Sequence, residues 1–370
     1  MFLNKKVLTI GGATLDTIIK YECMETMQIH KSNVKHSYAL LEEGAKIEVT
    51  EQKCFSGGGA TNAAVVFKKL GYDVSFFGKV GDDSAGKSIL DELSSLGINT
   101  TQAKITKQHG TANSYVIPSL EGDRMVFAYR GANTSVLDDD LPKDLIKDCD
   151  FVYVTSLSKA SAARLPKIVN LASEHNAKVA INPGISQLVL GSGFLKDALH
   201  GIDILILNLD EAKQFMFSLV TVDDDFKNAI NISSHKVSNE QSIDRKINYE
   251  DMHFSLKRFI REILRMGPTT VVVTDGANGV YVGTSSTLYF QESMKVPVTN
   301  TLGAGDSFGS SFVSGIYSGK TIEESIKWGL INSASVIGFP DAKTGILEKE
   351  SLLAKLNSDY VNTNCVKLSW

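Results

Sequence analysis

The chain has 370 residues, 43% of them hydrophobic and 22% charged, and a formal net charge of -4. This composition is typical of a globular protein, and the length suits one large α/β domain with added elements or two modest domains. The slight negative charge argues against nucleic acid as the main partner.

Nothing in the sequence predicts a membrane or export segment. The apolar run at residues 7–10 precedes two glycines and is too short for a signal peptide, and no later run approaches the roughly 18 apolar residues of a membrane span. The four cysteines are scattered without the spacing of a zinc or redox site. We therefore expect a cytoplasmic protein with reduced thiols and no membrane partner.

Short apolar runs alternate with helical patterns along most of the chain. The runs are rich in β-branched residues and lie at residues 7–10, 74–77, 151–154, 179–181, 204–207 and 271–273. Apolar residues at helical spacing occupy residues 60–70, 84–96, 165–173 and 255–265. This alternation predicts an α/β fold with a mostly parallel sheet covered by helices on both faces.

Two kinds of segment interrupt this alternation. Residues 19–56 and 105–130 are extended in character and predict a small separate β-sheet, a lid, beside a core formed by residues 1–18, 57–104 and 131–370. Residues 220–250 contain three consecutive aspartates and a long polar run, which predicts an exposed insertion.

The segment from Asn300 to Phe312 carries the strongest chemical signal. Gly303, Ala304 and Gly305 come directly before a helical pattern, where free backbone N–H groups and the helix dipole can bind a phosphate. Asp306 follows at the helix start, where a carboxylate can accept a proton from an attacking hydroxyl group. An ordinary helix cap after a flexible loop is the alternative interpretation.

A second glycine-rich segment runs from Ser56 to Asn62. Its three glycines allow a ligand to approach the backbone, and Asn62 can donate and accept hydrogen bonds to hydroxyl groups. A plain strand-to-helix connection is the alternative. A dinucleotide-binding loop is disfavoured because Asn62 occupies the last glycine position of that fingerprint, and the chain has no P-loop motif.

Together these segments resemble the ribokinase family of sugar and nucleoside kinases, also called the PfkB family. The first family signature matches Gly58 to Asn62 with Ala64, Gly71 and Gly81, and the second matches residues 300–313. Further likenesses occur at residues 11–16, 129–133, 182–184, 208–211, 274–279 and 332. The resemblance implies a ribokinase-like three-layer α/β/α core with a small β-sheet lid.

The resemblance also implies roles for individual residues. Asp306 would be the general base, and Gly303, Ala304 and Gly305 would form an anion hole, the set of N–H donors for the transferred phosphoryl group. The acceptor substrate would contact Asp16, Gly58, Gly59 and Asn62. The nucleotide would contact Thr274, Gly276, Gly279 and Asn332, and Asn208 and Glu211 would place Mg²⁺ through water.

Two departures from the family pattern limit what the resemblance implies. Asn300 replaces the aspartate that in many relatives contributes to a monovalent-cation site, which leaves potassium activation open. Gly59 stands where ribokinases proper carry a lysine, and residues 155–158 lack the glutamate that ribokinases present to ribose. Both of the latter differences argue against ribokinase itself.

The predicted function is an ATP- and Mg²⁺-dependent kinase that phosphorylates a hydroxyl group of a sugar or sugar-like molecule. A nucleoside kinase is the nearest alternative, with Tyr38, Phe55, Tyr115 or Phe127 as a base-binding slot or simply as lid core. A non-catalytic sugar- or nucleotide-binding regulator is the alternative from another class. By analogy with the family, we also expect a homodimer formed through the lid.

Overall fold

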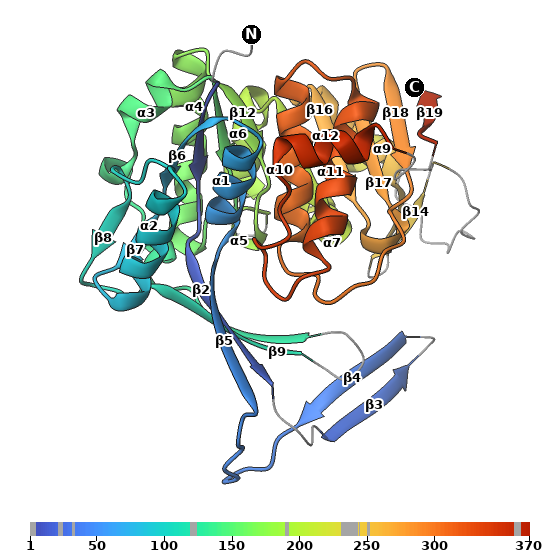
Figure 1. The fold of residues 1–370 in the computed structure, drawn as a ribbon. Coiled ribbons are helices and arrows are strands. Elements are labelled where there is room, and N and C mark those ends of the chain that lie inside the picture. Colours follow the sequence, from blue (N-terminus) through green and yellow to red (C-terminus); the bar gives the residue numbers. More distant parts are fainter. Residues whose placement is uncertain are drawn as a thin grey trace.

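A nine-stranded sheet runs through the centre of the structure (Figure 1). The computed structural model describes residues 5–20, 25–31, 34–118, 124–188, 192–230, 243, 245–249, 252–358 and 364–370. Six neighbouring strands are parallel, in the order β6 (Asp73–Phe77), β1 (Lys6–Ile10), β11 (Phe151–Val154), β12 (Lys178–Ile181), β13 (Ile204–Asn208) and β16 (Thr270–Thr274). The sheet continues antiparallel through β17 (Val280–Thr284), β18 (Thr287–Gln291) and β19 (Val366–Ser369).

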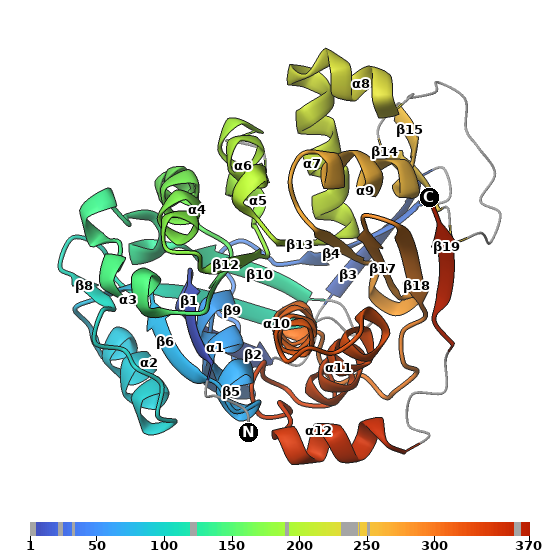
Figure 2. The same cartoon turned by 90° about the horizontal axis from the view of Figure 1, so that it is seen from above.

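Helices cover both faces of this sheet, as Figure 2 shows. One face carries α3 (Lys143–Asp148), α4 (Leu165–Glu174), α5 (Ile185–Leu188), α6 (Ser192–Ala198), α7 (Leu209–Val222), α8 (Asp224–Ile230) and α9 (Leu256–Arg265). The other carries α1 (Gly59–Lys69), α2 (Ser84–Ser95), α10 (Ala304–Tyr317), α11 (Ile322–Val336) and α12 (Lys349–Leu356). The fold is therefore the predicted three-layer α/β/α arrangement, and the six predicted parallel strands are confirmed.

The central strands are apolar along their whole length because each face lies against a layer of helices. In β11, Val152 and Val154 belong to one hydrophobic core, whereas Phe151 and Tyr153 belong to the other. All four side chains are at most 1% exposed. Alternation along a strand thus supplies both cores from one continuous apolar run.

A four-stranded sheet and a β-hairpin extend from one end of the core, whereas a short two-stranded pair lies beside the core (Figure 1). A four-stranded sheet has the order β10 (Arg124–Tyr129), β9 (Ala112–Pro118), β2 (Thr14–Lys20) and β5 (Glu51–Gly57). Two-stranded pairs are formed by β3 (Glu25–Lys31) with β4 (Val34–Leu40), and by β7 (Lys79–Gly81) with β8 (Lys104–Thr106). The four-stranded sheet starts earlier than predicted, at Thr14, because β2 follows core strand β1 after only three residues; its role as a lid stays a prediction.

The segment 220–250 differs from its prediction. Helix α7 continues to Val222, α8 follows at once, and β14 (Lys246–Tyr249) pairs with β15 (Met252–Ser255). Phe226, Ile230 and Ile247 are buried in the same core as α9. These three side chains depart from the expected exposed insertion, whereas most of the other described residues at 221–230 are exposed. Residues 231–242, 244 and 250 lie outside the described ranges.

In the described ranges, no helix combines the length and the apolar character that crossing a bilayer requires.

Candidate active site

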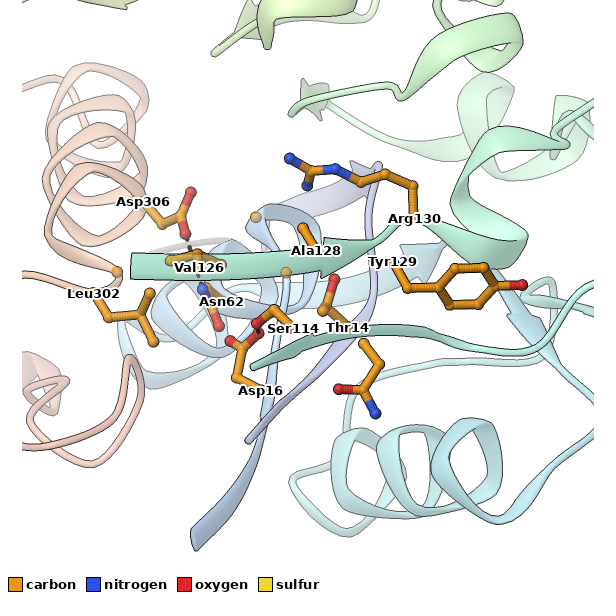
Figure 3. A pocket seen from close by; sticks show the side chains of 14 residues that line it. Thr14, Asp16, Asn62, Ser114, Val126, Ala128, Tyr129, Arg130, Leu302 and Asp306 are labelled. Atoms are coloured by element: carbon orange, nitrogen blue, oxygen red, sulfur yellow. Dashed lines mark hydrogen bonds between the residues drawn. The ribbon is translucent and has the colours of Figure 1, made fainter. Parts of the chain in front are cut away.

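The starts of two helices, one from each glycine-rich segment, meet at the edge of the core. Helix α1 begins after Gly58 and α10 begins after Gly303. Across the gap between them, Asn62 Nδ2 donates a hydrogen bond to Asp306 Oδ2 at 2.8 Å (Figure 3). The fold thus joins two motifs that lie 244 residues apart in the sequence.

Glycine is required by the backbone at both helix starts. Gly58 has φ 101°, and a Cβ there would lie 2.4 Å from the carbonyl oxygen of Gly12. Gly303 has φ 75°, and its Cβ would lie 2.4 Å from Cβ of Ala342. No side chain caps the first turn of α10, and a Cβ on Gly305 would meet nothing within 4 Å. The start of α10 therefore offers backbone N–H donors to an anion.

A cavity of about 220 Å³ lies between the helix starts and the small sheet (Figure 3). Six residues predicted from the sequence line it: Asp16, Gly58, Gly59, Asn62, Gly303 and Asp306. Its other lining residues are Thr14, Asn113, Ser114, Val126, Ala128, Tyr129, Arg130 and Leu302. The structure thus brings the proposed acceptor-binding residues and the proposed base into one cavity.

One buried polar atom in this cavity lacks a partner of its own. Oδ1 of Asn62 is buried and accepts no hydrogen bond from the part of the chain that the structure describes. Asp16 is 8% exposed and accepts a hydrogen bond from the Ser114 hydroxyl. Because unsatisfied buried acceptors are costly, the cavity is complementary to a ligand that carries several hydroxyl donors.

Two carboxyl groups line the cavity, and the pKa of each lies above its ordinary value. Burial, together with the charge of Asp16, raises the pKa of Asp306 against the opposing effect of the Asn62 hydrogen bond. Burial likewise raises the pKa of Asp16, against the hydrogen bond from Ser114 and the charges of Lys343 and Arg130. A carboxylate with a raised pKa is a better proton acceptor than an ordinary aspartate.

A second cavity, of about 470 Å³, lies at the carboxyl ends of β13 and β16. Its lining includes Asn208, Glu211, Thr274 and Gly276, all predicted on the nucleotide or metal side. Asn208 caps α7: its Oδ1 accepts from the Glu211 N–H, and Glu211 Oε2 accepts from the Asn208 N–H, both at 2.8 Å. Burial, helped by the charge of Asp306, raises the pKa of Glu211 to about 7.

Two predicted nucleotide residues do not line this cavity. Gly279 has φ 128°, and a Cβ there would lie 2.3 Å from the carbonyl oxygen of Gln291, so it serves the turn between two strands. Asn332 is fully buried, where its Nδ2 donates to Ser311 Oγ and its Oδ1 accepts from the Leu347 N–H. Both polar groups of this side chain thus join α11 to its neighbours, and the nucleotide contact of Asn332 stays a prediction.

Sequence reasoning missed the lining residues that β9 and the segment after β10 contribute. Ser114 reaches Asp16 because β9 pairs with β2 in a register that places the two residues opposite each other. No motif marks Ser114 or Asn113. Arg130 could have been identified from the sequence, because it lies in the stretch 129–133 that resembles the family. No role was assigned to that stretch.

The family model described as pfkB family carbohydrate kinase matches residues 25–350, which is most of the chain. The chain belongs to the pfkB family. It is accordingly a phosphotransferase that acts on a hydroxyl group, a sugar or nucleoside kinase from a family that uses ATP.

Individual pfkB relatives agree with this assignment. Ribokinase of Staphylococcus aureus is 27% identical over 318 residues, covering 84% of this chain and 86% of the relative. Guanosine-inosine kinase of Exiguobacterium acetylicum is 26% identical over 305 residues, covering 81% and 89%. The structure of Arabidopsis thaliana ribokinase complexed with ribose and ATP superimposes with a TM-score of 0.71 at 18% identity, covering 96% of this chain and 100% of that one. This last likeness supports the fold.

Proposed function

We propose that this chain transfers the γ-phosphoryl group of ATP to a hydroxyl group of a sugar or sugar-like small molecule, with Asp306 as general base. One observation carries the proposal. Asp306 stands on the first turn of α10, lines the cavity that has an unsatisfied hydroxyl-binding atom, and interacts electrostatically with Glu211 in the second cavity. It therefore lies where an acceptor hydroxyl and a phosphate donor would meet.

The side chains around Asp306 suit proton acceptance. The hydrogen bond from Asn62 holds Oδ2 in place, while Oδ1 lies where a Cβ on Gly59 would approach it to 3.2 Å. Because Gly59 has no side chain, an acceptor hydroxyl has room beside Oδ1. The proton of that hydroxyl moves to Asp306 as its oxygen attacks phosphorus.

The remaining residues orient the two substrates. Asp16 and the free Oδ1 atom of Asn62 accept hydrogen bonds from the other hydroxyl groups of the acceptor. The N–H groups at the start of α10 donate to phosphoryl oxygens, in the manner of an anion hole. Movement of the small sheet over the cavity would exclude water that otherwise hydrolyses ATP.

The second cavity fits Mg²⁺ with a nucleotide. Glu211 supplies one carboxylate and Asn208 one amide, and oxygen donors this few suit a metal ion that keeps several of its waters. Thr274 and Gly276 would contact the nucleotide. When bound, Mg·ATP supplies the phosphoryl group and a cation that offsets the negative charge near Glu211 and Asp306.

The lining of the acceptor cavity supports a sugar rather than a nucleoside. Of the four aromatic residues considered as a base-binding slot, none lines it: Tyr38, Tyr115 and Phe127 are exposed, and Phe55 lines a different cavity. Tyr129 is the aromatic side chain in the lining, which leaves no aromatic pair to enclose a base. A nucleoside acceptor remains the second candidate.

The proposal is tested by ADP release from Mg·ATP against pentoses, hexoses, sugar acids, sugar phosphates and nucleosides. Acids and phosphates belong in the panel because the Arg130 guanidinium lines the cavity. Turnover on one class identifies the acceptor. Saturable binding of a sugar with no turnover on any acceptor would instead make the chain a binding protein.

We expect phosphoryl transfer without potassium. Asn300 Nδ2 donates to the carbonyl oxygen of Pro340 at 2.8 Å, and its Oδ1 accepts from the Leu302 N–H. This amide thus bridges two loops beside the anion hole without a cation. Wild-type turnover should be equal in potassium and tetramethylammonium buffers.

The variant Asn300→Asp provides the matched control for this expectation. Its carboxylate faces the Pro340 carbonyl oxygen with no proton to donate, so turnover should fall and potassium should restore it. Strong potassium activation of the wild-type protein would contradict the bridging role of Asn300.

The homodimer through the lid stays a prediction. The hairpin of β3 and β4 presents Met27, Ile29, Tyr38 and Leu40, each at least 44% exposed, which is compatible with an interface.

A further inference from the structure

A third cavity, of about 380 Å³, lies behind the small sheet, on the side away from the acceptor cavity. Leu15, Ser56, Glu92 and Lys343 contribute to its lining. Lys343 is only 8% exposed, although it carries a charge and comes from the loop after α11. A buried lysine needs partners to remain ionised, and its partners show what it connects.

The Lys343 ammonium joins a strand and a helix. Its Nζ donates to Ser56 Oγ on β5 and pairs with Glu92 Oε1 on α2 at 3.2 Å. The Ser56 hydroxyl in turn donates to Glu92 Oε2 at 2.6 Å. The three side chains therefore form a closed cluster that fixes the end of strand β5 just before α1.

This cluster lies directly behind Asp16. Ser56 pairs with Leu15, the neighbour of Asp16 on β2. The next residue, Gly57, is so close to the carboxylate that a Cβ there would lie 2.0 Å from Asp16 Oδ2. The charge of Lys343 acts on Asp16 and opposes the effect of burial on that carboxyl. Lys343 thus affects Asp16 both through the strand and through its charge.

The loop that carries Lys343 also contacts the anion hole. Asp341 Oδ2 accepts hydrogen bonds from the N–H groups of Lys343 and Thr344, which fixes the shape of the loop. Ala342, between Asp341 and Lys343, packs against Gly303, since a Cβ added to Gly303 would collide with Ala342. One short loop therefore touches both the acceptor-binding sheet and the start of α10.

We propose that Lys343 is a positioning residue for the acceptor, which keeps Asp16 charged and in place from the far side of the sheet. This inference rests on the proposed role of Asp16. The groups that face Asp16 are Ser114 of β9, Arg130 after β10, Asp306 of α10 and Lys343. Those that face Lys343 are Ser56, Glu92, Asp341 and Asp16. Lys343 and Arg130 are the cations that offset the two carboxylates of the acceptor cavity.

The direct test is a titration of the Asp16 carboxyl by ¹³C NMR, with Asp16→Asn used to assign the signal. In Lys343→Met the Asp16 pKa should rise, because a compensating positive charge is lost. Lys343→Arg should keep the wild-type titration, because it keeps the positive charge. An unchanged Asp16 titration in Lys343→Met overturns the proposal.

Kinetics supply the second measurement. With the acceptor found in the panel, Lys343→Met should raise the acceptor KM about tenfold, as expected for coupled neighbours, and leave the ATP KM unchanged. Lys69→Met is the control, since Lys69 lines the same cavity but bonds to the Ile346 carbonyl oxygen. Equal losses on both substrates would contradict the positioning role. Failure of the kinase assignment is distinguishable, because it would appear as no turnover in the wild type while the NMR titration still decides the role of Lys343.

Discussion

Replacing Asp306 with asparagine is expected to lower kcat for phosphoryl transfer by about two to four orders of magnitude, with little change in ATP binding. The amide keeps the size of the side chain but cannot accept the proton of the acceptor hydroxyl. Since the Asn62 amide donates to Asp306 Oδ2, the variant is best oriented with its own oxygen toward Asn62. Steady-state ADP release with the acceptor from the panel measures the loss.

The pH dependence of kcat provides an independent check on Asp306. Asp306 accepts a proton only when it is ionised, and burial together with Asp16 raises its pKa. Wild-type kcat should therefore fall on the acid side at a pH above the ordinary range of an aspartate, and Asp306→Asn should lack this limb. Asp91→Asn, at an exposed ion pair on α2, is the control with unchanged turnover. Near-normal turnover in Asp306→Asn would remove Asp306 from the base role.

Replacing Asp16 with alanine should act on the acceptor instead. Loss of hydrogen bonds from substrate hydroxyls to a charged group is expected to raise the acceptor KM by about ten- to a hundredfold. The ATP KM should stay near its wild-type value, because Asp16 lines the acceptor cavity and not the cavity with Thr274. Initial rates with each substrate varied in turn separate the two constants.

Ser114→Ala is the graded control for this effect. It removes the hydroxyl that donates to Asp16 but keeps the carboxylate, so its effect on the acceptor KM should have the same direction and a smaller size. If only the ATP KM rose in Asp16→Ala, Asp16 would contact ATP and not the acceptor.

The parallel strands could be predicted because burial on both faces leaves an unmistakable apolar run, as in β11 and β13. Their order in the sheet could not, because β1 pairs with β6 and β11, which are distant in sequence, and no local pattern specifies that choice. The antiparallel edge formed by β17, β18 and β19 was missed for a related reason. These strands have mixed polarity, and β19 follows them only after three intervening helices.

The candidate site shows the same limit at the level of single residues. Gly58 and Gly303 were found because their positive φ angles demand glycine, and such demands leave motifs in the sequence. Ser114 and Lys343 leave none, since each acts through a pairing or a loop contact that exists only in the folded chain. Asn332 is a different case: the resemblance assigns it to the nucleotide, its side chain joins α11 to its neighbours, and the nucleotide contact stays a prediction.

The hydrogen bond between Asn62 and Asp306 also constrains how the protein is made. Asp306 lies 244 positions after Asn62, and this stretch is synthesised in about 12 to 50 s at typical elongation rates of roughly 5–20 residues per second. Throughout that interval the first glycine-rich segment has emerged while α10 does not yet exist. The lining of the first cavity is therefore incomplete until synthesis is about four-fifths finished, because Gly303 and Asp306 belong to it. Premature termination anywhere before α10 yields a chain without Asp306, the proposed base.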